Sequence, residues 1–226
     1  MSEAALELRG VKRHFDQGLV RALDGVDLTV AVRETVAIVG PSGSGKSTLL
    51  NLAGTLDFAS EGTVRIFGEA VAPRMARGRL DHLRRSVIGF VFQQHHLLAN
   101  YTLCENVELA LRPRGIVGAA ARGRAAQLLD QVGLAARRDF LPVRVSAGER
   151  QRAALARALA NDPRIILADE PTGNLDSHNG QAVLDLLLER SAACGSTLLV
   201  VTHNPEIAAR LGRTIVLRDG RIEREH

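Results

Sequence analysis

A glycine-rich loop stands between an apolar stretch and a helix-like run, and it constrains the fold of this chain more than any other feature. The loop, residues 40–47, reads GPSGSGKS; it follows the β-branched stretch 35–39 and opens into residues 48–53. Glycines let several backbone N–H groups converge on one anion, and the start of the following helix adds its positive end. Because strand, loop and helix come in this order, the sequence predicts a phosphate-binding loop in an α/β fold.

Two side chains of this loop have the chemistry that a bound nucleotide needs. Lys46 would reach the β- and γ-phosphates, and Ser47 would offer its hydroxyl to Mg²⁺. The chain contains only one other lysine, Lys12, so a lysine here runs against a composition that strongly prefers arginine. The alternative, a glycine-rich turn that happens to contain a lysine, does not explain the order of strand, loop and helix. The predicted nucleotide-binding residues of this segment are Gly40, Ser42, Gly43, Ser44, Gly45, Lys46, Ser47 and Thr48.

Length and composition favour a single nucleotide site on one folded chain. The 226 residues are 46% hydrophobic, which is enough for one sizeable core with a smaller appended lobe. A formal net charge of +4 permits a nucleic acid or an anionic membrane as neighbour, but a charge this small is typical of a solvated surface. Cys104 and Cys194 show neither a disulfide framework nor a metal motif, and this fits a reducing, cytosolic setting. Residues 1–7 lack a cationic segment and a long apolar run, so any connection to a membrane is expected to run through a partner.

The order of the predicted elements places a helical middle between two α/β blocks. Strands are predicted at residues 6–11, 26–32, 35–39, 62–67, 86–92, 164–168, 196–202 and 214–217. Helix-compatible runs lie at residues 48–53, 77–85, 103–111, 119–132, 148–160, 181–190 and 205–211. No internal repeat, low-complexity tract or long linker interrupts this pattern.

Two strands in the second half of the chain end in side chains that fit phosphate chemistry. The apolar run 164–168 is followed by Asp169 and Glu170, and the run ending at Thr202 is followed by His203. Open α/β folds bind ligands at the carboxyl ends of their parallel strands. Asp169 would hold Mg²⁺ through water, and Glu170 would orient or deprotonate the attacking water. A polar turn and a structural histidine are the alternatives, and the phosphate-binding loop elsewhere in the chain favours function.

The segment VSAGERQR at residues 145–152 admits two interpretations. Ser146 would cap the helix that follows, and Glu149, three residues later, would complete a capping box. The start of a helix is also an anion site, so Ser146 and the backbone at Gly148 would equally suit a phosphate that belongs to another subunit. Physical reasoning alone leaves these two interpretations open.

Six motifs in a fixed order resemble the ATP-binding subunit of ABC transporters over nearly the whole chain. They are the phosphate loop, Gln93 after an aromatic-rich strand, residues 145–151, residues 165–170, residues 174–176 and His203. The resemblance implies a single ABC ATP-binding domain over residues 1–226. Its fold would be an α/β P-loop NTPase core of ABC type, with an N-terminal antiparallel β subdomain and an inserted α-helical subdomain near residues 94–160. Motifs similar to the branch that serves lipoprotein release, macrolide-type export and cell-division signalling lie at residues 52–57, 89–93, 105–109 and 169–176.

The resemblance also implies a role for each matching residue. Phe15 would stack on adenine, unless it is a core residue beside a strand. Gln93 would sense Mg²⁺ and the attacking water, unless it is merely an exposed polar residue after a strand. In a head-to-tail homodimer that holds two ATP molecules, His203 would contact the γ-phosphate and position the water of Glu170. The opposing subunit would supply Ser146, Gly148, Glu149 and Asp176. The implied catalytic residues are thus Glu170, His203 and Gln93, and the implied Mg²⁺ ligands are Ser47, Gln93 and Asp169.

Two residues depart from the pattern of the family. Ala147 stands where the family usually has glycine; the methyl group is tolerated if the backbone there is helical and weakens closure of the dimer if it is not. Arg33 occupies a turn position that is commonly glycine, and we expect no functional consequence from it.

The partner that the resemblance implies is an integral membrane permease, which places the chain peripherally at the cytoplasmic face of the cell membrane. ATP binding would close the dimer, hydrolysis would open it, and the helical subdomain would pass this motion to the permease. No direct binding of nucleic acid is expected. Candidates for the docking groove are Phe90, Phe92, Leu97, Leu98 and Tyr101.

Three other functions use the same kind of cassette. ATPases of DNA repair and chromosome organisation carry a long coiled-coil insertion between the phosphate loop and residues 145–151, and this chain shows none. Translation factors of this type carry paired cassettes, and one cassette is present here. An ATPase that controls a cell-wall hydrolase during division has the same motifs, so the sequence leaves that alternative open.

Overall fold

The computed structural model describes residues 3–226, and Met1 and Ser2 lie outside the described residues. The chain divides into two compact units. The first unit contains the N-terminal part as far as Arg84 together with Gly195–His226, and the second contains Arg85–Cys194. The chain passes from the first unit to the second within the π-helical turn η2 (Leu83–Val87). It returns after the long helix α6 (Ser177–Cys194).

An antiparallel sheet forms one part of the first unit. Its strands run in the order β2 (Val20–Ala31), β1 (Ala4–Phe15), β4 (Glu61–Ile66) and β5 (Glu69–Val71), and the turn η1 (Asp16–Gly18) joins β1 to β2. Leu6 of β1 pairs with Val30 on one side and Ile66 on the other. All three side chains are buried. Since alternate residues of a strand point to opposite faces, this register buries one apolar face of the sheet.

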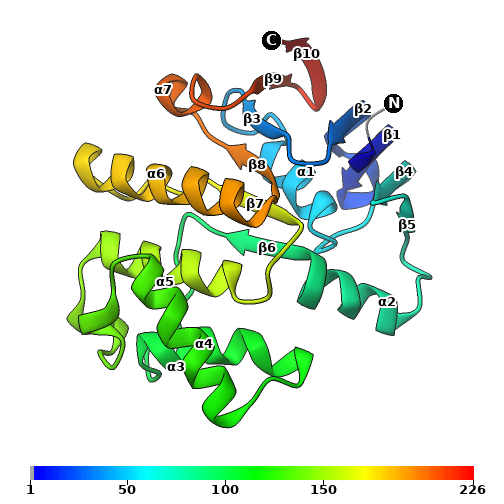
Figure 1. Ribbon diagram of the computed structural model, residues 1–226. Coiled ribbons are helices and arrows are strands. Elements are labelled where there is room, and N and C mark those ends of the chain that lie inside the picture. The colour runs from blue at the N-terminus through cyan, green and yellow to red at the C-terminus, as the bar shows by residue number, and fades with distance from the viewer. Residues whose placement is uncertain (1–2) are drawn as a thin grey trace. The chain divides into compact units, whose positions relative to one another are not determined.

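A mixed sheet forms the other part of the first unit. The central strand β3 (Thr35–Val39) runs parallel to β8 (Thr197–Val201) and to β9 (Arg213–Arg218), and β9 pairs antiparallel with β10 (Arg221–Glu225). The side chains of β8 are all buried, as those of parallel strands covered on both faces usually are. Figure 1 shows the helices α1 (Lys46–Ala53) and α7 (Pro205–Ala208) beside these sheets, while α2 (Arg77–His82) follows β5 along the chain.

The second unit combines a parallel strand pair with helices. β6 (Ile88–Val91) runs parallel to β7 (Ile165–Asp169). The helices α3 (Leu103–Leu111), α4 (Gly118–Gln131) and α5 (Ala147–Leu159) pack against one another, and α5 also packs against α6 (Figure 1). Short 3₁₀ turns lie at η3 (Arg112–Arg114), η4 (Ala135–Arg137) and η5 (Pro142–Arg144). Buried leucines on each of the three packed helices, such as Leu111, Leu129 and Leu155, form their common core.

The predicted elements are present, with differences at their ends. β3 and α3 have the predicted bounds, whereas β1, β2 and α6 are longer than predicted. The run 77–85 is an α-helix only as far as His82, and the helix predicted at 205–211 ends at Ala208. The short strands β5 and β10 were not predicted. In residues 3–226, no helix combines the length and the apolar character that crossing a bilayer requires.

Candidate nucleotide-binding site

The phosphate loop has a backbone that only glycine can adopt at two positions. A Cβ atom at Gly40 would lie 2.0 Å from the carbonyl oxygen of Leu217, and one at Gly45 would lie 2.2 Å from that of Ala22. Gly45 also has φ 102°, in the region that residues with a side chain avoid. The loop is therefore folded tightly against neighbouring strands, and its N–H groups lie at the start of α1.

Polar groups of the loop fit a bound phosphate. The ammonium group of Lys46 donates hydrogen bonds to the carbonyl oxygens of Gly40, at 2.8 Å, and Pro41, at 2.7 Å, so it is held over the loop. A lysine has three donors, and these two bonds leave one more for a ligand. The hydroxyl of Ser44 is buried and has no hydrogen-bond partner within residues 3–226, and a buried polar atom of this kind is costly unless a ligand satisfies it. Ser47 is exposed at the first turn of α1.

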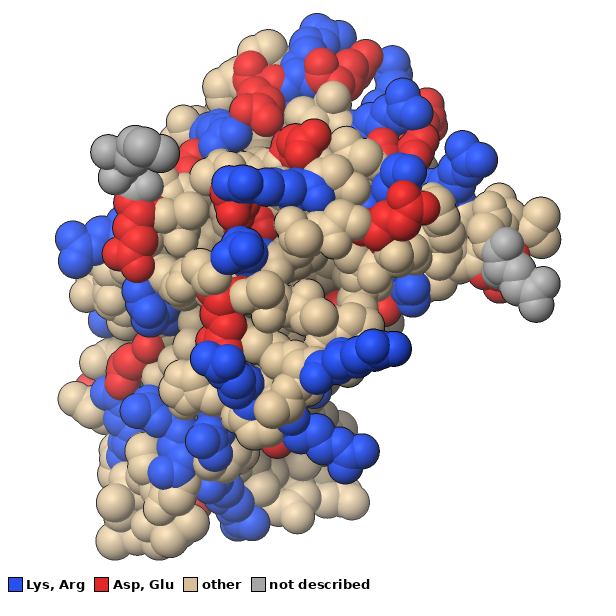
Figure 2. Space-filling model, turned by 90° about the vertical axis from the view of Figure 1, so that its right-hand side faces the viewer, with Lys and Arg blue, Asp and Glu red and all other residues tan. Residues whose placement is uncertain are grey.

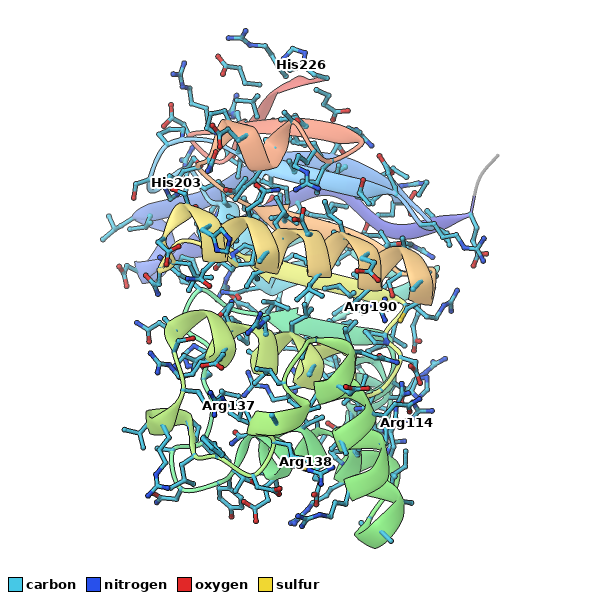
Figure 3. All side chains as sticks on the ribbon, turned by 60° about the vertical axis from the view of Figure 1, so that its left-hand side comes forward. Arg114, Arg137, Arg138, Arg190, His203 and His226 are labelled. Atoms are coloured by element: carbon cyan, nitrogen blue, oxygen red, sulfur yellow. The ribbon has the colours of Figure 1, made fainter. Side chains whose placement is uncertain are left out.

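His203 lies at the same sheet edge as the phosphate loop. β3 and β8 are parallel neighbours, and the N–H of Thr202 donates to the carbonyl of Ile38 at 3.1 Å. The exposed side chain of His203, labelled in Figure 3, lines a pocket of about 540 Å³ together with Val39, which directly precedes the loop. Within the first unit, the structure thus brings the two predicted elements together at the carboxyl ends of parallel strands, where such sheets bind ligands.

Phe15 lies at the end of β1 and is not a core residue. Its side chain is 38% exposed, so the alternative of a buried structural phenylalanine is wrong. The guanidinium group of Arg13 lies 4.4 Å from the centre of its ring, and Arg13 is itself paired with Asp57 at 2.7 Å. The ring is therefore oriented by a cation–π contact and keeps exposed surface on which a planar base can stack.

In the second unit, the acidic pair ends β7 in a strained turn. Asp169 is the last residue of the strand, and Glu170 adopts φ 44°, a left-handed conformation that is unusual for a residue with a side chain. The N–H of Gly173 donates to the carbonyl of Glu170 at 3.0 Å and closes the turn. Strained backbone of this kind concentrates at functional sites.

Gln93 contacts the segment that follows this turn. Its side-chain N–H donates to Oδ1 of Asn174 at 3.4 Å, and the side chain of Asn174 donates to the carbonyl of Gln93 at 3.2 Å. Gly173 lies so close that a Cβ atom there would stand 3.0 Å from Nε2 of Gln93. Asp176 follows and caps α6: its carboxylate accepts hydrogen bonds from the backbone and the side chain of Asn179, and these bonds lower the pKa of Asp176.

The segment at residues 145–152 forms the capping box that the sequence allows. The N–H of Glu149 donates to Oγ of Ser146 at 3.2 Å, and the N–H of Ser146 donates to Oε2 of Glu149 at 2.8 Å. The latter bond is the main reason that the pKa of Glu149 is lowered. Gly148 is buried, and a Cβ atom there would come within 3.0 Å of Asn179.

The two departures from the family pattern have different local consequences. Ala147 is the first residue of α5 and has helical geometry, so its methyl group is tolerated there. Arg33 has φ 65°, which costs about 1–2 kcal/mol for a residue with a side chain. Its N–H donates to the hydroxyl of Thr197 at 2.9 Å, so the turn is nevertheless held in place. Arg33 therefore carries a local strain that the sequence did not indicate.

The predicted docking residues divide into buried and exposed ones. Leu97 is only 8% exposed, whereas Leu98 and Tyr101 are 50% and 41% exposed. The rings of Phe90 and Phe92 are stacked on each other, with 5.1 Å between their centres. Leu97 therefore belongs to the core, and the loop around Leu98 and Tyr101 is the part that a partner can reach.

Sequence reasoning missed the side chain that organises this loop. Asn106 of α3 is buried; its side chain accepts from the N–H of Leu98 at 2.7 Å and donates to three carbonyl oxygens, those of Leu98, Tyr101 and Thr102, at 2.9–3.1 Å. The signal was available, because an asparagine stands here between the buried residues Cys104 and Val107. A buried amide in such a position needs partners.

The described part of the chain has no preformed metal site built from several His, Cys, Asp or Glu side chains. Residues 3–226 contain no cluster of three or more His, Cys, Asp or Glu side chains that could hold a metal ion. The predicted Mg²⁺ set is of another kind, since it combines the hydroxyl of Ser47, the amide of Gln93 and the carboxylate of Asp169. Such oxygen donors suit Mg²⁺, which keeps waters and shares substrate phosphates.

Basic and acidic side chains are interspersed over most of the surface in Figure 2, as on an ordinary solvated face.

Comparisons with known proteins agree with this site. Residues 23–173 match the sequence model of a family described as ABC transporter. The chain is 48% identical to the lipoprotein-releasing system ATP-binding protein LolD of Gluconobacter oxydans, with 97% of this chain and 95% of that protein covered. It is 47% identical to LolD of Ruegeria pomeroyi, with both chains fully covered. It is also 48% identical to the macrolide export ATP-binding/permease protein MacB 1/2 of Paracoccus denitrificans, over 96% of this chain. The chain spans about a third of the length of the macrolide exporters that it matches.

A solved structure shows the same fold. The ATP-binding cassette MJ0796, described as a dimer in a post-hydrolysis state bound to ADP and Pi, superposes with a TM-score of 0.89 at 41% sequence identity. The superposition covers 98% of this chain and 97% of that chain. The predicted fold class, a P-loop NTPase core of ABC type with an antiparallel β subdomain and a helical subdomain, is confirmed.

The glycine-rich phosphate loop and the fold define the chain as a nucleotide-binding P-loop cassette. It belongs to the ABC transporter family. Within that family it is an ATP-binding cassette, similar to the branch of the lipoprotein-releasing and macrolide-export proteins.

Proposed function

We propose that this chain binds and hydrolyses ATP as the energy-supplying subunit of a transporter of the lipoprotein-release or export type, with a separate permease in the membrane. The observation that carries the proposal is the geometry of the loop. Gly40 and Gly45 leave no room for a side chain, the buried hydroxyl of Ser44 has no hydrogen-bond partner among the described residues, and Lys46 is held over the loop. The end-to-end similarity to lipoprotein-releasing ATP-binding proteins supports the branch.

In this proposal, different residues of the site bind the phosphates, hold Mg²⁺ and activate the attacking water. The loop amides, Lys46 and Ser44 bind and orient the phosphates of ATP. When bound, Mg²⁺ neutralises charge on the phosphate oxygens, and Ser47, Gln93 and Asp169 would hold it. The carboxylate of Glu170 accepts a proton from the attacking water. The strained backbone of Glu170 fixes the direction of this carboxylate, and the imidazole of His203 stabilises charge on the γ-phosphate.

A homodimer completes two such sites in this proposal. The cassette MJ0796, which resembles this chain, is described as dimeric. The N-terminus of α5, with Ser146, Gly148 and Glu149, would face the phosphates of the opposing subunit, where the positive end of the helix favours an anion. The capping box keeps the first turn of α5 intact, so its orphan N–H groups point in one fixed direction. Asp176 would lie at the same interface, beside the opposing loop.

The permease would bind the exposed loop that contains Leu98 and Tyr101, which would place the chain at the cytoplasmic face of the cell membrane. Aromatic and apolar side chains on a rigid loop are typical anchors of an interface. Regulation of a cell-wall hydrolase during division is the alternative that uses the same ATPase, and it differs only in what the membrane partner does. Direct binding of nucleic acid has no place in either function.

Two variants test the catalytic proposal. Lys46→Ala should abolish turnover and strongly weaken ATP binding, because it removes the cation that matches the β- and γ-phosphates. Glu170→Gln should keep ATP binding, stop phosphate release and stabilise a dimer in Mg-ATP, because an amide cannot take a proton while the binding contacts persist. Nucleotide affinity, phosphate release and size-exclusion chromatography measure these effects. Turnover at the wild-type rate in Lys46→Ala would refute the assignment of the loop.

A second experiment tests the partner. Purification from solubilised membranes, followed by mass spectrometry, should recover one integral membrane protein with this chain. Tyr101→Asp should break that association and spare ATP binding, because a charge buried in an interface is costly. Val117→Asp is the matched control, since Val117 is 61% exposed and directly precedes α4, and the whole of α3 separates it in the sequence from the proposed docking loop. Recovery of ribosomes or nucleic acid without an integral protein would contradict the transporter function.

A further inference from the structure

An arginine on α5 holds two consecutive carbonyl groups of the segment that follows Gln93. Nη2 of Arg157 donates to the carbonyl of His95 at 2.7 Å, and Nη1 donates to that of His96 at 2.6 Å. Both bonds are short, as charge-assisted hydrogen bonds are. His96 adopts φ 45°, a left-handed conformation in which both carbonyls can face one guanidinium group.

Packing alone does not explain an arginine at this position. Arg157 is half-buried, and this burial lowers its pKa, with no carboxylate among the described residues to offset the cost. An apolar side chain would stabilise the same helix without desolvating a charge. The guanidinium group is therefore explained by what it binds, which is the main chain at residues 95–96.

The same helix holds the other end of this segment. The side chain of Gln151, one of the buried polar residues, donates to the carbonyl of Phe92 at 2.9 Å. The ring of Phe92 meets that of His96 edge to face, with 5.2 Å between the ring centres. Residues 92–96 are thus attached to α5 at both ends by side chains of that helix.

A cavity lies within this arrangement. It has a volume of about 450 Å³ and is lined by residues 93–96 together with Ala147 and Gln151 of α5. The pocket is also lined by Pro171, Asn174 and Leu175 of the turn after β7, so it lies beside the segment that carries Gln93. Side chains of α5 nevertheless reach the segment at both of its ends, Gln151 at the carbonyl of Phe92 and Arg157 at those of His95 and His96.

We propose that Arg157 is a positioning residue that makes the segment bearing Gln93 move together with α5, the helix whose N-terminus carries Ser146. The inference rests on the proposed function, in which Gln93 contacts Mg²⁺ and the attacking water and Ser146 faces the opposing nucleotide. A displacement of α5 on closure of the dimer then moves Gln93 into place at the same time. Arg157 itself touches neither nucleotide nor metal in this proposal.

The test compares steady-state ATP hydrolysis in Arg157→Ala and in a control. Arg114→Ala is the control, because Arg114, labelled in Figure 3, likewise donates from its guanidinium group to the backbone, at the carbonyl of Asn161, which is far from Gln93 in the sequence. We expect Arg157→Ala to lower kcat about 10-fold, the loss typical of residues that orient a metal ligand, with KM for ATP unchanged. Arg114→Ala should keep the wild-type kcat and KM.

A double-mutant cycle separates positioning from stability. In a Gln93→Ala background, Arg157→Ala should have no further effect on kcat, because there is no amide left to position. If the alanine variant does not fold, Arg157→Lys serves instead, since one ammonium group can still reach a carbonyl; its kcat should fall between those of wild type and Gln93→Ala. Additive losses, or a lower melting temperature with unchanged kcat, would overturn the inference. A wild-type protein without turnover would instead refute the proposed function, and this inference with it.

Discussion

Replacement of Asn106 by alanine should destabilise the second unit by an amount that the hydrogen bonds allow us to work out. The side chain makes four hydrogen bonds with the loop at residues 98–102. The carbonyls of Leu98 and Thr102 keep a second partner after truncation, the N–H groups of Tyr101 and Asn106 respectively. The N–H of Leu98 and the carbonyl of Tyr101 lose the partner that the structure gives them.

Two backbone groups are therefore left unsatisfied. Each buried polar group without a partner costs about 1–3 kcal/mol, and water can reach this half-exposed loop, so the low end of the range applies. We expect Asn106→Ala to lower the free energy of unfolding by about 2–3 kcal/mol. For a chain of this size, that corresponds to a fall in Tm of about 4–12 °C. Thermal and urea unfolding, followed by circular dichroism, measure both quantities.

Asn161→Ala is the matched control in the same unit. Among residues 3–226 its side chain makes one hydrogen bond, from Nδ2 to the carbonyl of Ala110 at 2.7 Å, while its buried Oδ1 has no partner there. Truncation should cost about 1 kcal/mol or less, since it also removes an unsatisfied atom. The loop that Asn106 holds carries Leu98 and Tyr101, so Asn106→Ala should also weaken binding of the membrane partner while ATP affinity is kept. Equal effects of the two variants on Tm would refute the reasoning.

Three further predictions concern the nucleotide site. Gly45→Ala should lower the free energy of unfolding by about 2–4 kcal/mol and abolish ATP binding, because its methyl would meet the carbonyl of Ala22. Gly43→Ala is the control, because nothing lies within 4 Å of the added atom, and it should cost only about 1–2 kcal/mol of backbone strain. Equal losses of stability in thermal unfolding would contradict this. Ser146→Arg should impair hydrolysis but not ATP binding by the monomer, whereas a purely structural cap predicts a lower Tm with normal activity per folded molecule. The pKa of Glu149 lies below its ordinary value of 4.5, so its ionised form stabilises the protein fully above that pH and loses this effect as the pH falls through the lowered pKa. Glu149→Gln should therefore lower Tm at neutral pH, and its difference in Tm from the wild type should shrink as the pH falls through the lowered pKa; a difference that stays constant with pH would rule the linkage out.

Features that depend on neighbouring residues could be predicted from the sequence. The phosphate loop, the bounds of β3 and α3, and the capping box at Ser146 and Glu149 are of this kind. In each, the interacting groups lie within a few residues of one another, so the order of residue types specifies the geometry. The resemblance to ABC cassettes then suggested the roles that we propose for Gln93 and Asp176, which spacing alone does not reveal.

Contacts between distant parts of the chain were settled only by the tertiary structure. β10 has one apolar residue, the half-buried Ile222, among charged neighbours, and it is a strand because it pairs with β9. The strain at Glu170 and the helical geometry at Ala147 depend on the turns and helices around them. Arg157 binds a carbonyl 62 residues away in the sequence. Such bonds join a side chain to a backbone group that every residue possesses, so no pattern of residue types marks the acceptor, and only the folded chain brings the two together.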